Sequence, residues 1–279
     1  MFASATLSIM SSLFGKHNAK AKNISYLYSV IVTLSAMLSW GVICYSNEGF
    51  RLEAIGYSLV YGTFYTMAMV GMFMAYQIGS VSLTAFVKQL SLIAVSFWGF
   101  IFWNNPVTAN IAIGILLIIG ALYLCFKPDK PGIQKISARW CVFAIMLLVG
   151  NAGCSITQKY QQTAFDGNNG HAFMFFGAAV SFAVSLILYL KNGIDRPKIS
   201  KRTLICPVAG GISSALLNLL ILRLISSDLS ESIIFPGIAV GGLTITMLFS
   251  LAVYKERLSG RQWLGLSVGV VALIFLNLA

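Results

Sequence analysis

Long apolar segments separated by short polar gaps follow one another along the whole chain of 279 residues. A transmembrane helix needs roughly 20 mostly apolar residues to cross a hydrocarbon core of about 30 Å. Several gaps also carry helix-start residues, namely Asn105 before Pro106 and the capping boxes Asp228-x-x-Glu231 and Ser259-x-x-Gln262. The pattern therefore predicts an all-α membrane protein with ten transmembrane helices. The predicted ranges are 1–15, 24–46, 55–77, 80–103, 106–126, 140–159, 171–190, 203–223, 229–254 and 260–279.

The longest polar connection, 127–139, divides the chain into halves of five predicted helices each, 1–126 and 140–279. Aligning the halves with an offset of 151 places NNPVTANIAIG over KERLSGRQWLG and pairs Gly114 with Gly265. A repeat with an odd number of spans forces the second half to lie upside down relative to the first. We therefore expect two inverted five-helix repeats, which is the architecture of many secondary transporters.

Composition and charge support a membrane protein. The chain is 58% hydrophobic and only 10% charged, whereas soluble domains carry roughly 25% charged residues. The net charge of +11 would suggest a nucleic-acid partner in a soluble protein. Here the basic residues lie in short gaps and form no continuous patch, so we expect no nucleic-acid binding.

The basic residues instead indicate topology, because cytoplasmic loops are enriched in Lys and Arg. Apart from Lys88, one side holds only Arg51, Lys159 and Arg223. The other side holds Lys16, Lys20, Lys22, Lys127, Lys130, Lys135, Arg139, Lys191, Arg196, Lys198, Lys201, Arg202, Lys255, Arg257 and Arg261. This asymmetry predicts a multi-pass protein of the inner or plasma membrane with the basic loops in the cytoplasm and both termini outside.

Lys88 is the most informative residue, because it lies inside the fourth predicted helix with apolar sequence on both sides. An ionisable side chain inside the membrane costs at least ~2.5–3.5 kcal/mol and usually faces a cavity or a partner. Thr84, Lys88 and Ser91 share one helical face by their i, i+4, i+7 spacing. The spacing predicts a polar stripe that points inward to a substrate cavity. The alternative is a structural lysine that snorkels or binds backbone carbonyls.

Other polar or aromatic residues within the predicted spans are candidates for the same cavity, although each taken singly is more often a packing residue. Asn151 and Asn218 stand out, because an amide deep in lipid requires a partner. Pro236, followed by Gly237, removes a backbone donor and indicates either an interrupted helix at a binding site or a simple kink. The remaining candidates are Trp40, Tyr65, Tyr76, Gln89 and Gln158.

The chemistry of catalysis is not evident in the sequence. We find no nucleophile motif, no metal-ligand cluster and no phosphate-binding loop, so we expect no enzyme activity, no cofactor and no bound metal. All eight carboxylates fall in loops or in terminal turns of predicted helices. A lysine inside the membrane without an embedded acid favours a substrate with a carboxylate or phosphate group, anionic or zwitterionic.

The ends of the two halves resemble the EamA type of the drug/metabolite transporter superfamily, and the resemblance covers essentially the whole chain. The segment KERLSGRQWLGLSVGVVALIFL is similar to the family's G-E-R-L-T-x-x-Q-x-x-G turn and last helix. The first half keeps Pro106, Val107, Thr108 and Gly114 but has Asn105 where the family usually has an acid. The resemblance implies a ten-helix fold of two inverted repeats, a cavity near the midplane and transport of small metabolites by alternating access. It does not imply a particular substrate.

These observations predict a secondary active transporter of a small polar metabolite, anionic or zwitterionic. The main alternative is a broad-specificity exporter of amino acids or drugs in which Lys88 is structural. A non-transporting membrane subunit is a third interpretation, but it would need neither an interior lysine nor an inverted repeat. The expected partners are the small-molecule substrate and the lipid bilayer, and the sequence leaves the oligomeric state open, a homodimer included.

The charge asymmetry makes a testable prediction about topology. A topology reporter inserted in the 48–53 loop, or fused after Ala279, should register on the outside, because positive loops are retained in the cytoplasm. A reporter inserted in the 127–139 connection should register in the cytoplasm and serves as the control. A cytoplasmic signal from the Ala279 fusion would contradict the predicted orientation.

Overall fold

The computed structural model describes residues 2–17, 24–47, 49–103, 108–126, 137–192, 201–225, 231–255 and 258–277. These residues form ten α-helices and no strand, which confirms the all-α prediction. The helices are α1 (Phe2–His17), α2 (Ile24–Ser46), α3 (Ile55–Ile78), α4 (Val81–Phe102), α5 (Ala109–Phe126), α6 (Ala138–Ala164), α7 (Gly170–Lys191), α8 (Lys201–Ile225), α9 (Glu231–Val253) and α10 (Gly260–Asn277).

Helix ends follow local capping chemistry. The predicted capping box at the start of α10 is confirmed, because Gln262 Oε1 accepts from Ser259 N at 3.0 Å and Ser259 Oγ accepts from Gln262 N at 3.1 Å. At α6, Ser137 Oγ accepts from Trp140 N at 3.1 Å, which starts this helix two residues before the predicted position. The caps proposed at Asn105 and Asp228 lie outside the described residues.

The described residues include five helices that are long and apolar enough to cross a membrane: α2, α3, α6, α7 and residues 204–223 of α8. Large apolar side chains on several helices point outward, among them Val42 and Leu116, each 69% exposed. Fully buried positions instead include hydroxyls such as Ser29, Ser181 and Ser185. An apolar exterior around a hydroxyl-containing interior is the distribution expected for helices packed in lipid, where small polar residues join helices.

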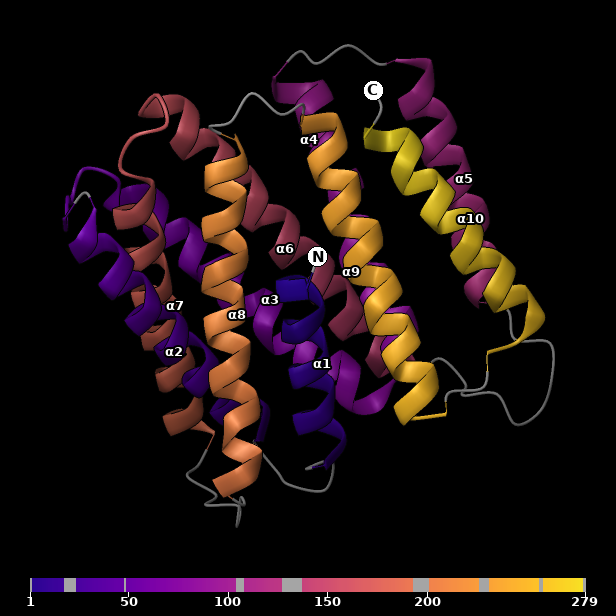
Figure 1. Cartoon of the computed structure of the whole chain (residues 1–279), viewed down its shortest axis with the longest axis horizontal. Helices are drawn as coiled ribbons and strands as arrows, with labels where there is room; N and C mark the ends of the chain where they lie inside the picture. The colour runs from indigo at the N-terminus through magenta and orange to yellow at the C-terminus, as the bar shows by residue number, and fades with distance from the viewer. Residues whose placement is uncertain are drawn as a thin grey trace.

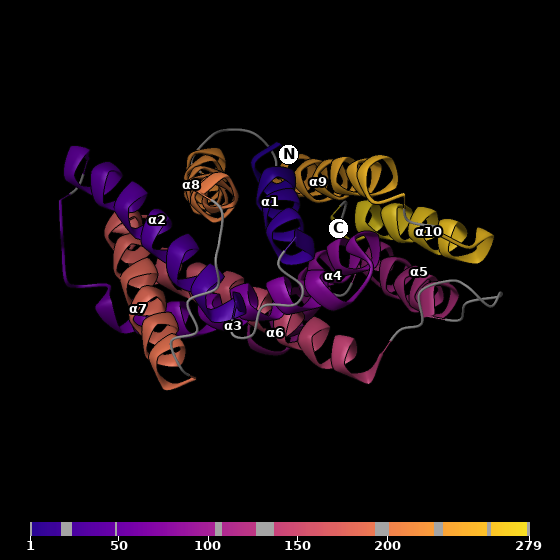
Figure 2. The same cartoon turned by 90° about the horizontal axis from the view of Figure 1, so that it is seen from below.

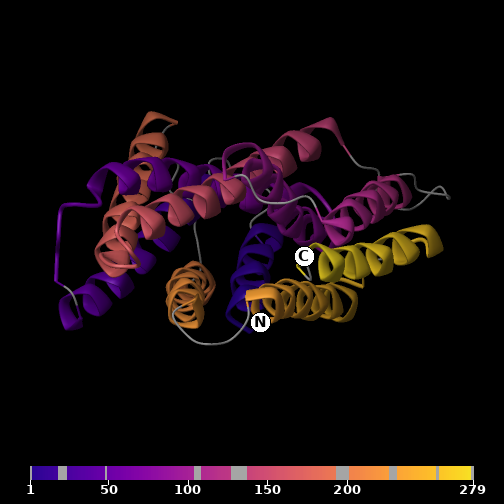
Figure 3. The ribbon, with the colours of Figure 1, turned by 90° about the horizontal axis from the view of Figure 1, so that it is seen from above.

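The helices lie in an elongated arrangement with two faces. Helices α8, α1 and α9 lie on one face and α3 and α6 on the other, as Figures 2 and 3 show from below and above. Helix α2 packs against α7 at one end, and α5 packs against α10 at the other end (Figure 1). Helix α1 packs against α3, α8 and α9, so it lies at the centre of the assembly.

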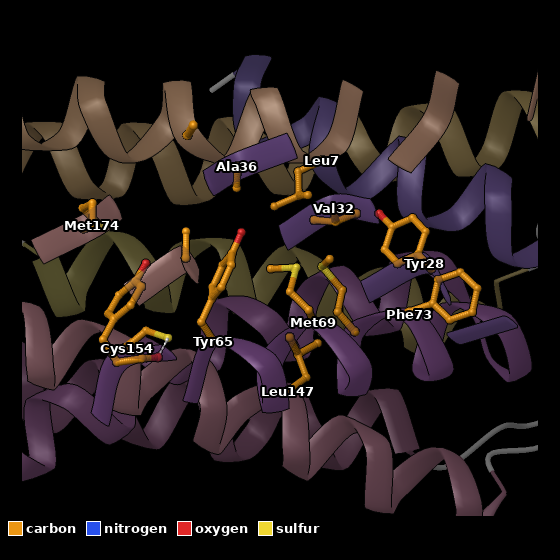
Figure 4. Close-up of a cluster of buried hydrophobic side chains, with 14 of the residues drawn as sticks. Leu7, Tyr28, Val32, Ala36, Tyr65, Met69, Phe73, Leu147, Cys154 and Met174 are labelled. Carbon is orange, nitrogen blue, oxygen red and sulfur yellow. Dashed lines mark hydrogen bonds between the residues drawn. The ribbon is translucent and has the colours of Figure 1, made fainter. Parts of the chain in front are cut away.

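Helices α3 and α6 form the most extensive contact, and glycine makes their close approach possible. A Cβ added at Gly150 would lie 2.6 Å from the backbone nitrogen of Ala68, and one at Gly71 would lie 2.7 Å from that of Leu147. Small residues that let helix backbones approach are typical of membrane helix interfaces. Around this contact, Figure 4 shows Tyr65, Met69 and Leu147 in one buried cluster.

The α3–α6 contact generates a prediction about stability. Gly150→Ala should lower the free energy of unfolding by about 1–3 kcal/mol, because the new methyl group meets backbone atoms that cannot rotate away. The loss should appear as a lower melting temperature in detergent. Gly120→Ala is the matched control, since a Cβ there meets nothing within 4 Å and helix propensity should leave the protein equally or more stable. Equal melting temperatures for the two variants would contradict close α3–α6 packing.

Candidate functional site

Lys88 lies in α4 with seven helical residues before it, about 10 Å from the start of the helix at 1.5 Å per residue. Its side chain is 8% exposed, and its Nζ atom has no hydrogen-bond partner among the described residues. An uncompensated charge at such a position is costly in free energy. Within the part of the chain that the structure describes, the Lys88 amino group is therefore buried and has no hydrogen-bond acceptor.

Two members of the predicted polar stripe of α4, Thr84 and Ser91, contact α6 through their side chains. Thr84 and Ser91 are buried together with Lys88. Asn151 of α6 donates from Nδ2 to Ser91 Oγ at 2.8 Å and to the Lys88 carbonyl at 3.5 Å. Ser91 Oγ in turn donates to the Lys88 carbonyl at 2.8 Å. The structure thus joins Asn151, Ser91 and the backbone of Lys88, and Asn151 has the partner that its depth in the span requires.

Trp140 belongs to this cluster but was not predicted from the sequence. Its Nε1 donates to Thr84 Oγ1 at 3.0 Å, and the side chain is 2% exposed. The ring lies so close to Gly79 that any side chain there would overlap it. A tryptophan near the start of a predicted span indicates an interfacial anchor, so the sequence pattern favoured a lipid-facing position over a buried one.

A second group of predicted residues lies between α3 and α8. Tyr65 and Ser214 share a hydrogen bond of 2.8 Å between their hydroxyl groups. Asn218 Nδ2 donates to the Ser214 carbonyl at 2.9 Å, so its partner is its own helix. The ring of Tyr61 stacks on that of Tyr65 with a centroid distance of 5.8 Å. Figure 4 shows Tyr65 pointing into the buried cluster.

The other candidates are spread over separate contacts. Trp40 packs near His171 between α2 and α7, with ring centroids 6.3 Å apart. Tyr76 is fully buried in the apolar cluster of α1, α2 and α3. Gln89 lies near α9, since a Cβ added at Gly242 would be 3.9 Å from its Nε2 atom. The predicted residues therefore do not form one cluster.

Gln158 and Pro236 complete the predicted set. Gln158 lies two turns beyond Asn151 on α6, and its buried Nε2 atom has no hydrogen-bond partner among the described residues. Helix α9 is assigned without interruption from Glu231 to Val253, so the chain is helical at Pro236 and Gly237 rather than unwound. The side chains at 231–240 lie outside the described residues.

A pocket of about 420 Å³ opens elsewhere, between the first turns of α3 and the end of α6. Its lining residues are Glu53, Gly56, Tyr57, Val60, Thr157 and Tyr160. None of the predicted site residues lines it. The described residues also contain no group of three His, Cys, Asp or Glu side chains that could hold a metal ion.

The comparisons establish a shared fold. No protein-family model and no curated protein matches the chain. One solved structure, described only as "Crystal structure of protein", is similar with a TM-score of 0.60 and 12% identity. The similarity covers 98% of this chain and 94% of the other. An all-helical fold of this arrangement is therefore present in a solved structure over nearly the full length of both chains.

The Asn151–Ser91 bond yields a prediction that a double-mutant cycle can measure. Asn151→Ala and Ser91→Ala should show a coupling of about 0.6 kcal/mol, with ~1.7 kcal/mol as the upper range, as measured for hydrogen bonds between membrane helices. The control pair is Asn151→Ala with Ser155→Ala. Ser155 Oγ donates to the backbone carbonyl of Asn151 at 3.2 Å, a bond that survives loss of the amide, so this pair should be additive. Additivity of the first pair in an unfolding titration would show that the α4–α6 bond does not form.

Proposed function

We propose that this protein is a secondary active transporter of small anionic or zwitterionic metabolites, with Lys88 as the residue that binds the anionic group. The observation that carries the proposal is the Lys88 Nζ atom, buried and without a hydrogen-bond partner among the described residues. No described acidic side chain forms an ion pair with it. A carboxylate or phosphate of a substrate would supply the charge and the acceptors that an ammonium group requires.

The wider proposal is a fold of ten transmembrane helices in two inverted five-helix repeats, as in the EamA type of the drug/metabolite transporter superfamily. Helix contacts support it. Exchanging the halves maps α1–α5 onto α6–α10. The packed pairs α3–α6, α3–α7 and α4–α6 then map onto α8–α1, α8–α2 and α9–α1, all of which are packed as well. The pairs α2–α7, α4–α9 and α5–α10 map onto themselves.

Contacts at the two ends of the bundle support the proposed alternation of helix direction. Lys16, at the end of α1, donates from Nζ to the carbonyl of Gly79, which follows α3, at 2.8 Å. At the opposite end, Asn169 before α7 donates to Glu53 before α3 at 2.8 Å. The first pair belongs to the basic side of the chain and the second to the side with few basic residues. We propose that the basic side faces the cytoplasm of an inner or plasma membrane.

The proposed mechanism uses the charge of Lys88 to couple binding to transport. An empty site holds an ammonium group whose desolvation is not compensated, so occlusion of the empty site is unfavourable. A bound carboxylate or phosphate offsets that charge and lowers the cost of occlusion. Asn151 would position Lys88 for substrate binding, because its amide holds Ser91 and the backbone carbonyl of Lys88 in place. The loaded site can then open to the other side of the membrane.

Variants at Lys88 test the proposal. Lys88→Met should abolish uptake while leaving folded protein with an equal or higher melting temperature, because the neutral chain of similar length removes the buried charge. Lys88→Arg should also be impaired, since a planar guanidinium seldom fits a site shaped for an ammonium group. Succinate, phosphate and glutamate serve as probes, first for thermal stabilisation of the purified protein and then for uptake into proteoliposomes. A saturating ligand at 100 times its Kd stabilises by about 2.7 kcal/mol.

The opposite pattern would favour a broad-specificity exporter with a structural lysine. In that case Lys88→Met would lower the melting temperature, and whatever protein folds would transport normally. Thr63→Ala is a suitable control, because Thr63 is exposed and its hydroxyl donates only to the carbonyl of Val60 in its own helix. Full transport by a well-folded Lys88→Met protein would end the anion-site proposal.

A further inference from the structure

The pocket between α3 and α6 contains one carboxylate, that of Glu53. Glu53 lies directly before α3, and its Oε2 atom accepts from Asn169 Nδ2 at 2.8 Å. No described Lys or Arg forms an ion pair with it. Lys159, which precedes the lining residue Tyr160 in the sequence, lies over the ring of Trp103 at 4.2 Å from its centroid. The carboxylate is therefore held in position while its charge stays available.

The remaining lining is aromatic and apolar. Tyr57 and Tyr160 contribute rings, and Val60 and Thr157 contribute aliphatic surface. Both rings are fixed by neighbours. The Tyr57 ring packs edge-on against Phe165 at a centroid distance of 6.1 Å, and Tyr160 accepts a hydrogen bond from Trp98 Nε1 at 3.2 Å. The pocket is thus a preformed surface with one anionic group and two aromatic rings.

We infer that this pocket binds an organic cation, in which an ammonium group contacts the Glu53 carboxylate and its hydrocarbon part lies between the rings of Tyr57 and Tyr160. An ammonium group over a tyrosine face gains cation–π attraction in addition to the ion pair. The volume of about 420 Å³ falls within the 300–1,000 Å³ typical of small-molecule sites. An inorganic cation would use only the carboxylate, because aromatic and aliphatic side chains supply no ligand oxygens beyond the hydroxyl groups.

The site is separate from the one at Lys88 in both position and charge. The pocket is lined from the loop before α3, the first turns of α3 and the end of α6, whereas Lys88 lies in α4 and contacts the middle of α6 through Asn151. The inference therefore does not depend on the proposed transport activity. Its test measures binding and not uptake, so the two proposals can fail independently.

The probe is hexyltrimethylammonium, titrated into the purified full-length protein by calorimetry, with 1-hexanol as the uncharged comparison. The protein should bind the cation and show at least tenfold weaker binding of the alcohol. Glu53→Gln should weaken binding of the cation at least tenfold, because the amide keeps the shape but not the charge. Tyr57→Leu should weaken it about two- to fivefold, and Tyr57→Phe should bind normally, since the ring face is retained.

Asp166→Asn is the matched control. Asp166 is an exposed acid in the loop between α6 and α7, at a left-handed backbone position (φ 47°) that asparagine tolerates. This variant removes one negative charge from the same end of the molecule without touching the pocket, so its affinity for the probe should equal that of the unmodified protein. Melting temperatures of all variants show that each one is folded.

Binding in nanodiscs of two lipid compositions shows whether the natural ligand of the pocket is a free organic cation or the headgroup of a lipid. In nanodiscs of phosphatidylglycerol alone, the probe should bind as it does in detergent. In discs with phosphatidylethanolamine, unchanged probe affinity indicates a free solute. A lipid headgroup is indicated if the probe no longer binds in these discs and native mass spectrometry shows phosphatidylethanolamine retained by the unmodified protein but not by Glu53→Gln. Unchanged probe binding by Glu53→Gln, or equal binding of 1-hexanol, would overturn the inference.

Discussion

The close contact of α3 with α6 is the constraint on which the rest of the structure depends. Lipid tails are as apolar as leucine side chains, so burial of apolar surface does not drive helices together within a membrane. Van der Waals contact must replace it, and Gly71 and Gly150 let the two backbones approach closely enough. Both candidate sites are positioned by this pair. Asn151, on the face of α6 that meets α4, bonds Ser91 beside Lys88, and the Glu53 pocket lies between the start of α3 and the end of α6.

Each of the two sites contains a charged side chain without an ion-pair partner among the described residues, but the two side chains differ in their exposure to solvent. Lys88 is buried among helices, and its Nζ atom has no hydrogen-bond partner among the described residues. The cost of that arrangement is several kcal/mol at least, and such residues in membrane proteins generally serve a substrate or ion pathway. Glu53 is exposed at a helix end, where solvent keeps the cost of an unpaired carboxylate low. An unpaired charge is therefore more costly at Lys88 than at Glu53.

Most of the fold could be predicted from the sequence, and less of the site. The ten helices of the described residues follow from the apolar runs and the polar gaps between them, and five of these helices are long and apolar enough to cross a membrane. The stripe of Thr84, Lys88 and Ser91 follows from helical spacing and is buried as expected. The separation of Trp40, Tyr65 and Asn218 from this stripe could not be predicted. Periodicity identifies which residues share a face of one helix, but not which helix that face will meet.

What the sequence by itself determined is the class of element, its approximate position along the chain and the presence of one cation among apolar neighbours. Exact limits were not determined, since α6 ends at Ala164 and not at the predicted residue 159. The capping chemistry at Ser259 needed only local information, whereas the burial of Lys88 also depended on the helices that cover it. Only the tertiary structure decided the partners. It placed Asn151 against Ser91, Trp140 against Thr84 and Asn169 against Glu53. The physical reason is that helix association in lipid depends on close packing and on a few hydrogen bonds, and both are properties of two surfaces together rather than of either segment alone.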